Sequence, residues 1–349
     1  MSNVFTKRVV EPLPSRPLRA PDSESPAQAL AQSDSPLVDN RAVQGRSAPL
    51  SVLQVEVQQS GRKFELTATG FHEGELATQR RAGVQVEVKR LEKMLDSAHI
   101  SGGASRFLAV QSFAAVTGRD REGVLWVSPL AGPPGFLQGD DDILRVSAMP
   151  RRGDPLHRMP AGQQLGLLAI DFAARRRIRI NGTLVKGDNA GMTVRVDQAY
   201  GNCPQYIQRR DLNVSTLTAP AADERHATLL APADQAMIAA SDTFFLGTTH
   251  PVRGSDASHR GGSAGFVRVD SPEGLWWPDY LGNNMFNSFG NLAVDDEAAL
   301  LFTDFTTGAT LQVSGTAEVQ WTTPGAAGDD GGVGRRVAFS VDAVVALRH

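Results

Sequence analysis

Four uncharged polar side chains lie close together in residues 275–292: Asn283, Asn284, Ser288 and Asn291. The apolar residues of this segment recur at helical spacing after a glycine turn, and asparagine is a favoured N-cap. We therefore expect a helix that begins at Asn283 or Asn284. The start of a helix presents unpaired N–H groups and partial positive charge, which suit a phosphate. An ordinary capped helix with polar outer residues is the alternative interpretation.

An internal repeat shows which elements must position these side chains. Residues 127–136 and 257–266 share a strand followed by a glycine-rich turn, at an offset of 130. The apolar run 167–172 recurs as 300–305, and residues 177–183 recur as 310–316, both at an offset of 133. Three collinear matches indicate two copies of one β-rich domain, each with the pattern of a six-stranded barrel with an inserted helix.

The chain therefore divides into four parts. Residues 1–48 are rich in Pro, Ser and Ala and are predicted to be disordered, because they bury too little apolar surface to offset chain entropy. Residues 49–99 form a linker, with a strand expected within 53–66 and a helix whose apolar face holds Val84, Val88, Leu91 and Leu95. Copy one spans residues 100–215, and copy two spans residues 235–349.

The two copies differ in their polar residues. His259 and Arg260 of copy two stand opposite Pro129 and Leu130 of copy one, and the asparagine pair has no counterpart there. This asymmetry predicts one principal site, built by copy two, with copy one as the facing wall.

Two further groups of residues suggest chemistry less strongly. His72, Glu73 and Glu75 resemble metal ligands, but acidic residues in the first turn of a helix are expected electrostatically, so no metal site is predicted. Arg175, Arg177 and Arg179 share one face of a strand. Such a face could meet a phosphate, although an exposed basic face is the preferred interpretation.

Composition excludes several classes of protein. The 349 residues include 35 basic and 38 acidic side chains, a net charge of −3, which argues against a nucleic-acid or membrane-surface protein. The single cysteine, Cys203, excludes an intrachain disulfide. No apolar run is long enough for a membrane helix and no secretory signal is recognisable, so we expect a cytoplasmic protein.

Several motifs together resemble a known family. They are Ser258-His259-Arg260-Gly261-Gly262, Gly265-Phe266-Val267, Pro278-Asp279-Tyr280-Leu281-Gly282-Asn283-Asn284 and Leu301-Phe302-Thr303-Asp304-Phe305. In this respect residues 70–345 resemble the FMN-binding split-barrel flavoproteins related to pyridoxamine 5'-phosphate oxidase. The resemblance implies a mainly β fold of two tandem split barrels that form a pseudo-dimer within one chain, with FMN bound where they meet.

The resemblance also implies roles for individual residues. Arg260, Phe266 and Val267 would flank the flavin ring or ribityl chain, and Pro278, Asp279, Asn283, Asn284 and Ser288 would surround the phosphate end. Further residues expected to bind the cofactor are Ser258, His259, Gly261 and Asn291. Asn283-Asn284-Met285 replaces the basic phosphate cluster of the true pyridoxamine phosphate oxidases, so vitamin B6 oxidation is not expected.

The expected function is therefore that of an FMN-dependent oxidoreductase, monomeric or homodimeric, with an unknown substrate and no assigned catalytic residue. Its electrons would come from a nicotinamide donor or from a reductase protein. Two alternatives stay open: a flavin-binding protein without catalysis, and a haem-binding split barrel in which His259 or His250 binds iron.

Overall fold

A computed structural model of the chain describes residues 70–349, apart from residues 97, 202 and 203. These residues belong to one unit, Lys63–His349. The predicted disordered extension 1–48, the strand predicted within 53–66 and Cys203 lie outside the described residues. No helix among the described residues is long and apolar enough to cross a membrane.

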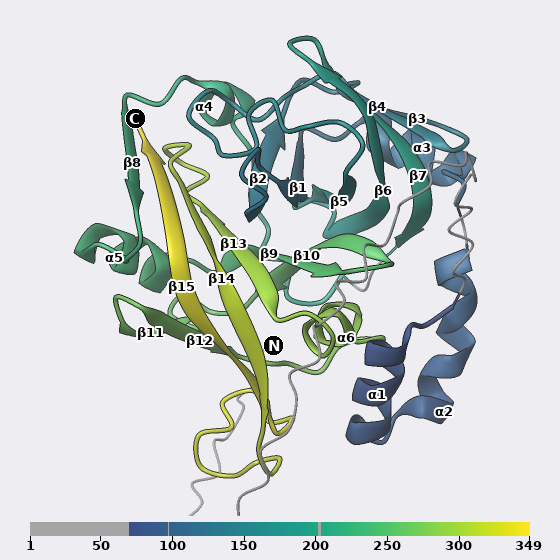
Figure 1. The fold of residues 1–349 in the computed structure, drawn as a ribbon, viewed down its shortest axis with the longest axis vertical. Helices are drawn as coiled ribbons and strands as arrows, with labels where there is room; N and C mark the ends of the chain where they lie inside the picture. The colour runs from purple at the N-terminus through teal and green to yellow at the C-terminus, as the bar shows by residue number, and fades with distance from the viewer. Residues whose placement is uncertain (1–69, 97, 202–203) are drawn as a thin grey trace, which may run out of the picture. The chain divides into compact units, whose positions relative to one another are not determined.

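Copy one forms a seven-stranded antiparallel sheet with the strand order β2-β1-β5-β6-β7-β4-β3 (Figure 1). Its strands are β1 (Phe113–Arg119), β2 (Leu125–Ala131), β3 (Leu137–Asp140), β4 (Ile143–Val146), β5 (Gln164–Asp171), β6 (Arg176–Asp188) and β7 (Gly191–Gly201). The sheet curves around a core that includes Leu130, Leu144 and Leu167.

Copy two repeats this topology in the order β10-β9-β13-β14-β15-β12-β11. Its strands are β9 (Thr243–His250), β10 (Gly254–Gly261), β11 (Arg268–Ser271), β12 (Gly274–Pro278), β13 (Glu297–Thr303), β14 (Thr310–Trp321) and β15 (Arg335–Arg348). A further strand, β8 (Asp223–Ala227), pairs with β15. A second core, which includes Phe244, Trp277 and Phe302, fills this sheet.

The two sheets also agree in register. Ala115 pairs with Leu168 in copy one, and Phe245 pairs with Leu301 at the equivalent place in copy two. Both copies carry a β-bulge at the same position, next to Gly182 and Gly315. The predicted tandem split barrels are thus confirmed. The expected count of six strands is wrong, because β3 and β11 have only four residues each and are too short to show alternation.

A third apolar cluster joins the copies. Phe113 of β1 lies 5.4 Å from Phe245 of β9 between ring centroids, and Phe172 and Phe305 pack edge to face at 5.1 Å. Strand β10 also contacts β5 and β6 of copy one, so each sheet covers part of the other. The pair of barrels therefore forms a pseudo-dimer within one chain, and we call the contact between them the seam.

Seven helical segments accompany the sheets within the described residues. They are α1 (Glu73–Ala82), α2 (Gln85–Val88), the 3₁₀ helix η1 (Lys89–Asp96), α3 (Gly102–Ala109), α4 (Val214–Thr218), α5 (Pro232–Ala240) and α6 (Asn287–Leu292). The face predicted from Val84, Val88, Leu91 and Leu95 packs against Tyr200 and Met285. Figure 1 shows α1 and α2 beside the sheets, with α6 between α1 and β13.

Candidate functional site

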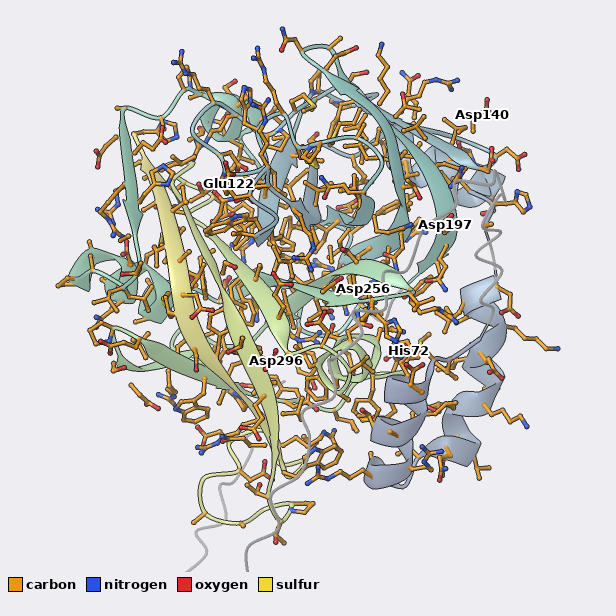
Figure 2. All side chains as sticks on the ribbon, viewed as in Figure 1. His72, Glu122, Asp140, Asp197, Asp256 and Asp296 are labelled. Carbon is orange, nitrogen blue, oxygen red and sulfur yellow. The ribbon has the colours of Figure 1, made fainter. Side chains whose placement is uncertain are left out.

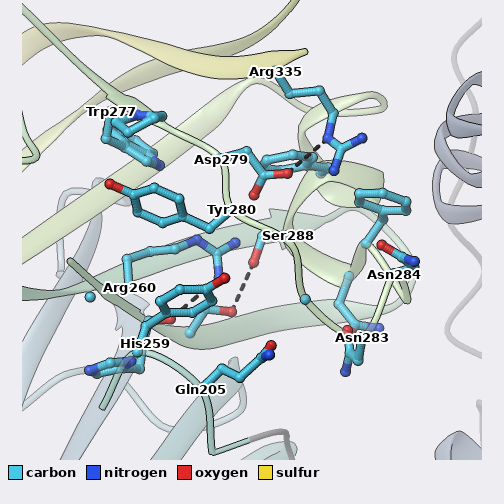
Figure 3. A pocket seen from close by; sticks show the side chains of 18 of the residues that line it. Gln205, His259, Arg260, Trp277, Asp279, Tyr280, Asn283, Asn284, Ser288 and Arg335 are labelled. Carbon is cyan, nitrogen blue, oxygen red and sulfur yellow. Dashed lines mark hydrogen bonds and ion pairs between the residues drawn. The ribbon is translucent and has the colours of Figure 1, made fainter. Parts of the chain in front are cut away.

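A pocket of about 950 Å³, including its open mouth, lies at the seam (Figure 3). Copy two contributes the end of β10, the segment from Trp277 to Gly282, and the residues before and within α6. Copy one contributes the opposite wall, which consists of Leu168, Arg177, Arg179, Gln205 and Tyr206. The pocket thus needs both copies.

Most residues predicted for the site line this pocket. They are Ser258, His259, Arg260, Gly261, Phe266, Pro278, Asp279, Asn283, Asn284 and Ser288. In Figure 3, Asn283 and Asn284 lie at one end of the pocket, and His259 and Arg260 lie at the other. The structure therefore brings together two segments that are more than twenty residues apart in the sequence.

Two predicted residues do not line the pocket. Val267 is buried in the apolar core of copy two. Asn291 is buried on the far side of α6, where its amide donates to Thr248 and Asp256 and its carbonyl oxygen faces His72. The prediction that they touch the ligand is corrected to a supporting position for each.

Arg260 brings a positive charge to the pocket. Its Nη1 contacts only the backbone oxygen of His259, at 3.4 Å, and its Nε has no partner among the described residues. The guanidinium lies 5.9 Å from the ring centroid of Phe289. Burial lowers the pKa of Arg260 to about 10, while Asp279 opposes this shift, so the side chain stays charged at neutral pH. Such a cation is suited to an anionic ligand.

His259 is a neutral donor. Its Nδ1 accepts a hydrogen bond from Arg177 Nη1 at 2.9 Å, which leaves the ring proton on Nε2. This Nε2 is buried and has no partner among the described residues. Burial, followed by the charges of Arg177 and Arg260, lowers the pKa of His259 well below its usual value. At neutral pH the imidazole therefore offers an N–H group and no charge.

A buried network fixes the floor of the pocket. Arg179 of β6 forms an ion pair with Asp256 at 3.3 Å and donates to the hydroxyl of Ser258. Ser258 in turn lies 2.8 Å from Ser288 between hydroxyl oxygens. Because every member is buried and has a partner, the network holds β10, β6 and α6 in one arrangement. The expectation that Arg179 belongs to an exposed basic face is wrong, because its partner Asp256 comes from the other copy.

The carboxylate of Asp279 is neutralised inside the pocket. Arg335 Nε donates to it at 2.8 Å, and both side chains are largely buried. Burial raises the pKa of Asp279, with Arg335 opposing the shift. The Arg335 guanidinium also lies over the Phe286 ring at 5.0 Å. This ion pair removes most of the repulsion that an anionic ligand would meet from Asp279.

The helix of this site begins later than the asparagine pattern predicts. Helix α6 starts at Asn287, and its N-cap is Phe286, which makes no side-chain capping bond. Asn284 and Phe286 both have a positive φ of 59°, and Asn283 accepts a bond from the Met285 N–H at 3.2 Å. The prediction of an N-cap at Asn283 or Asn284 is therefore wrong. Two left-handed residues place the asparagines in a turn before the helix.

A pair of tyrosines, one from each copy, closes one side of the pocket. Tyr206 and Tyr280 stack with ring centroids 5.2 Å apart and an interplanar angle of 26°. The Tyr206 hydroxyl donates to the backbone oxygen of Leu281 at 2.9 Å. A Cβ on Gly261 would lie 2.1 Å from the backbone oxygen of Tyr206. Only glycine at position 261 therefore lets the backbone at Tyr206 approach β10 so closely.

The equivalent position on the other side of the seam is filled by protein. There Gln312 stands where Arg179 stands in the pocket, and it donates to Ser128 at 2.8 Å. Asp154 accepts from Ser128 at 2.5 Å and is buried. Arg151 donates to Thr310, the counterpart of Arg177, at 2.9 Å. Arg151 of copy one thus contacts Thr310, the counterpart of Arg177, and Ser128 of copy one contacts Gln312, the counterpart of Arg179. Arg151 Nε, Asp154 Oδ2 and Gln312 Oε1 have no partner among the described residues.

No site role is predicted from the sequence for several other pocket residues, among them Gln205, Tyr206, Trp277, Tyr280 and Arg335. From the sequence, Arg177 and Arg179 are considered as phosphate contacts but an exposed face is preferred, although the repeat sets them against Thr310 and Gln312. A charged residue in one copy and an uncharged residue at the same position of the other copy indicates which side of the seam holds the charged pocket. Tyr206 carries no comparable pattern.

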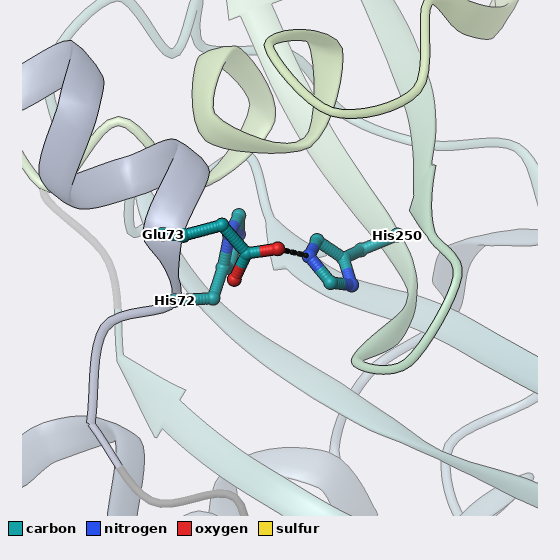
Figure 4. Close-up of side chains that lie close together, drawn as sticks. All are labelled: His72, Glu73 and His250. Carbon is teal, nitrogen blue, oxygen red and sulfur yellow. Dashed lines mark hydrogen bonds and ion pairs between the residues drawn. The ribbon is translucent and has the colours of Figure 1, made fainter.

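A cluster of His72, Glu73 and His250 outside the pocket has metal-ligand chemistry (Figure 4). However, Nδ1 of His72 accepts the Gly74 N–H at 3.2 Å, and Nδ1 of His250 accepts two backbone N–H groups at 3.1 Å. Both rings therefore carry their proton on Nε2, the nitrogen that would have to bind the metal. The arrangement favours a hydrogen-bonded cluster, in which His250 faces Glu73 at 3.1 Å.

Comparisons with known proteins place the fold. No protein-family model matches the chain, and no curated protein matches it. A solved structure of a putative pyridoxamine 5'-phosphate oxidase from Lactobacillus delbrueckii aligns with 34% of this chain and 94% of its own, with 17% identity and a TM-score of 0.28. The fold is similar to that of the pyridoxamine 5'-phosphate oxidase-related split barrels.

Two other split barrels give matches of the same kind. HupZ from Group A Streptococcus aligns with 33% of this chain and 92% of its own, with 12% identity and a TM-score of 0.27. HutZ from Vibrio cholerae, named a haem storage protein, aligns with 33% of this chain and 90% of its own, with 13% identity and a TM-score of 0.24. Each match corresponds to about the length of one copy. The likeness concerns the fold alone.

Proposed function

We propose that this protein is an FMN-dependent oxidoreductase that binds one flavin in the seam pocket. The observation that carries the proposal is Arg260, a cation that lines the pocket without a hydrogen-bonded carboxylate among the described residues. A half-buried cation whose Nε has no partner among the described residues favours a ligand of opposite charge. FMN is such an anionic ligand.

The remaining donors of the pocket agree with the same ligand. Nε2 of His259, Nε of Arg260 and Nε1 of Trp277 are buried donors without partners among the described residues. Asn283 and Asn284 add neutral donors at the other end. A flavin nucleotide is rich in acceptors along its phosphate, ribityl chain and ring edge, so its acceptors match the donors present.

The aromatic residues of the pocket suit a planar ring. Phe266, Trp277, Tyr280, Phe286 and Phe289 line it, and Tyr206 closes it from copy one. Flat aromatic walls favour a large conjugated ligand, since they bury its faces while polar groups bind its edges.

In this proposal the protein binds, orients and shields the cofactor. A bound flavin supplies the electron transfer, and the surrounding residues hold it and tune it. Asn283, Asn284 and Ser288 donate to the phosphate, and Arg260 faces the ribityl chain or the ring and contributes positive charge to the pocket. His259 donates from Nε2 to an acceptor on the ring system. No side chain is assigned as a catalytic acid or base, and the electrons come from a nicotinamide or from a reductase protein.

The tautomers of both candidate histidines favour flavin over haem. Iron binding needs a lone pair on the free ring nitrogen, but Arg177 directs the proton of His259 to Nε2. His250 has the same tautomer, because Val252 and Arg253 donate to its Nδ1. In neither ring does Nε2 offer the lone pair that iron binding requires.

Identification of the co-purifying cofactor tests the proposal. We expect yellow protein, FMN by mass spectrometry of the released ligand, and loss of colour on anaerobic addition of NADH, NADPH or a reductase with its donor. Yellow protein that no donor reduces would instead indicate a flavin-binding protein without catalysis. A Soret band with no flavin would overturn the proposal.

A further inference from the structure

Helix α1 lies outside both barrels but packs directly on the residues that form one end of the pocket. Its Gly74 meets Gly290 of α6 so closely that a Cβ on Gly74 would lie 2.0 Å from the Gly290 oxygen. Gln79 of α1 donates to the backbone oxygen of Met285 at 3.1 Å. The segment from Met285 to Gly290 is therefore enclosed between α1 and the pocket.

Glu75 makes the central contact of this packing. The side chain is 3% exposed, and its Oε1 accepts a hydrogen bond from Asn287 Nδ2 at 2.5 Å. Its Oε2 accepts the His72 N–H at 2.9 Å and completes a capping box at the start of α1. One carboxylate thus ties the beginning of α1 to the beginning of α6. Figure 2 shows His72 at the start of α1.

Helix α6 depends on such support from outside. It has only six residues, and its N-cap Phe286 makes no side-chain bond. Asn284 and Phe286 adopt the left-handed region, which costs free energy for residues other than glycine. A short helix that begins in this way is stable only when neighbouring groups hold it.

We propose that Glu75 is a positioning residue for the bound nucleotide: through Asn287 it holds residues 283–288 in the conformation that receives the phosphate. This inference rests on the proposed function, since it concerns the phosphate end of the flavin pocket. Asn287 and Ser288 line the pocket themselves, and Ser288 continues the contact to Ser258. Helix α1 is thereby part of the binding site although none of its residues lines the pocket.

The test compares FMN with riboflavin, which lacks the phosphate. Glu75→Gln removes the negative charge and converts one of the two accepting oxygens into an NH2 group, so the amide can accept from Asn287 or from the His72 N–H but not from both. We expect the Kd for FMN to rise about tenfold, a loss of one charge-assisted hydrogen bond, and the Kd for riboflavin to change less than threefold. Binding is measured by fluorescence quenching at pH 8, above the pKa of about 7 to which burial raises Glu75.

A matched control and a rescue complete the design. Glu87→Gln removes an exposed carboxylate from α2 and should leave both dissociation constants unchanged. Glu75→Asp keeps the carboxylate, serves as the conservative rescue and should retain more FMN affinity than Glu75→Gln. If Glu75→Gln does not fold, Asn287→Ser removes the same contact from the other side.

The outcomes separate the two proposals. Wild-type affinity for FMN in the Glu75→Gln and Asn287→Ser proteins would overturn the role of Glu75 and leave the flavin assignment intact. Equal losses for FMN and riboflavin would also overturn it, because they would indicate a general structural defect. If the wild-type protein binds neither flavin, the proposed function fails, and this inference fails with it.

Discussion

Arg177 of copy one donates from Nη1 to Nδ1 of His259 in copy two at 2.9 Å, across the seam. The contact determines which ring nitrogen carries the proton and contributes a positive charge that disfavours imidazolium. A residue of one copy therefore sets the chemical state of a residue in the other.

Replacing Arg177 by Thr, its counterpart in copy two, should raise the pKa of His259. The value should stay below the usual range, because burial is the largest cause of the shift and remains in place. NMR titration of the His259 Cε1–H signal measures the change, and Arg175→Thr, at an exposed position, is the control. An unchanged titration midpoint would show that Arg177 does not act on the ring.

Replacing Arg260 by Leu, its counterpart in copy one, should weaken FMN binding. The loss of a buried charge-assisted contact predicts a rise in Kd of about tenfold to a hundredfold. Arg268→Leu removes an exposed arginine from the next strand and should leave the Kd as it is. Fluorescence quenching gives both values, and similar values for the two variants would contradict the role of Arg260.

Introducing negative charge at the turn before α6 should repel the phosphate. We expect the double change Asn283→Asp and Asn284→Asp to lower the FMN content of the purified protein several-fold, while affinity for riboflavin changes little. Asn189→Asp, in an exposed turn of copy one, serves as the control. If the FMN content is unaffected, the phosphate does not lie at this turn.

The flavin content should be one per chain. At the seam position equivalent to the pocket, Arg151 donates to Thr310, and Ser128 bonds to Asp154 and Gln312, so protein side chains occupy the place of a second ligand. Flavin absorbance divided by protein concentration, measured after saturation with FMN and removal of the excess, gives the ratio. A ratio near two would mean that these side chains move aside for a second ligand.

The fold should lose stability in mild acid because of His72. Burial lowers the pKa of His72 to about 4, whereas the unfolded imidazole takes up a proton near pH 6.5. Between these values the unfolded chain binds more protons, so stability falls as the pH falls, by about 2 kcal/mol from this group at pH 5 relative to pH 7. Urea unfolding at both pH values should show a smaller pH dependence for His72→Asn, which can still cap α1, than for the exposed-site control His226→Asn.

The duplication and the general place of the site follow from local patterns. Glycine turns and apolar strands are recognisable from residues that are adjacent in the sequence, and the constant offset reveals the repeat. These patterns predict two barrels and one principal site, built by copy two. The start of α6 was misplaced because residues 284 and 286 adopt left-handed conformations that α1 and the pocket walls stabilise. The preference of asparagine for the N-cap position, taken alone, places such residues at the start of a helix.

The other differences between the sequence-based predictions and the structure involve contacts between residues that are distant in the sequence. Arg179 is buried because Asp256, 77 residues later, pairs with it, and His72 meets Asn291 across 219 residues. No spacing rule connects such pairs, so an arginine strand face was interpreted as exposed. Likewise, Asn291 was assigned to the ligand although its partners are His72, Thr248 and Asp256.

Covalent linkage of the two barrels has an evolutionary consequence. In an assembly of identical chains, every substitution appears on both sides of the twofold axis, so a change that closes one cavity closes its twin. Here positions 129 and 259 mutate separately, which allowed proline at one and histidine at the other. Dilution also cannot disassemble the cavity, because both of its walls belong to the same polypeptide.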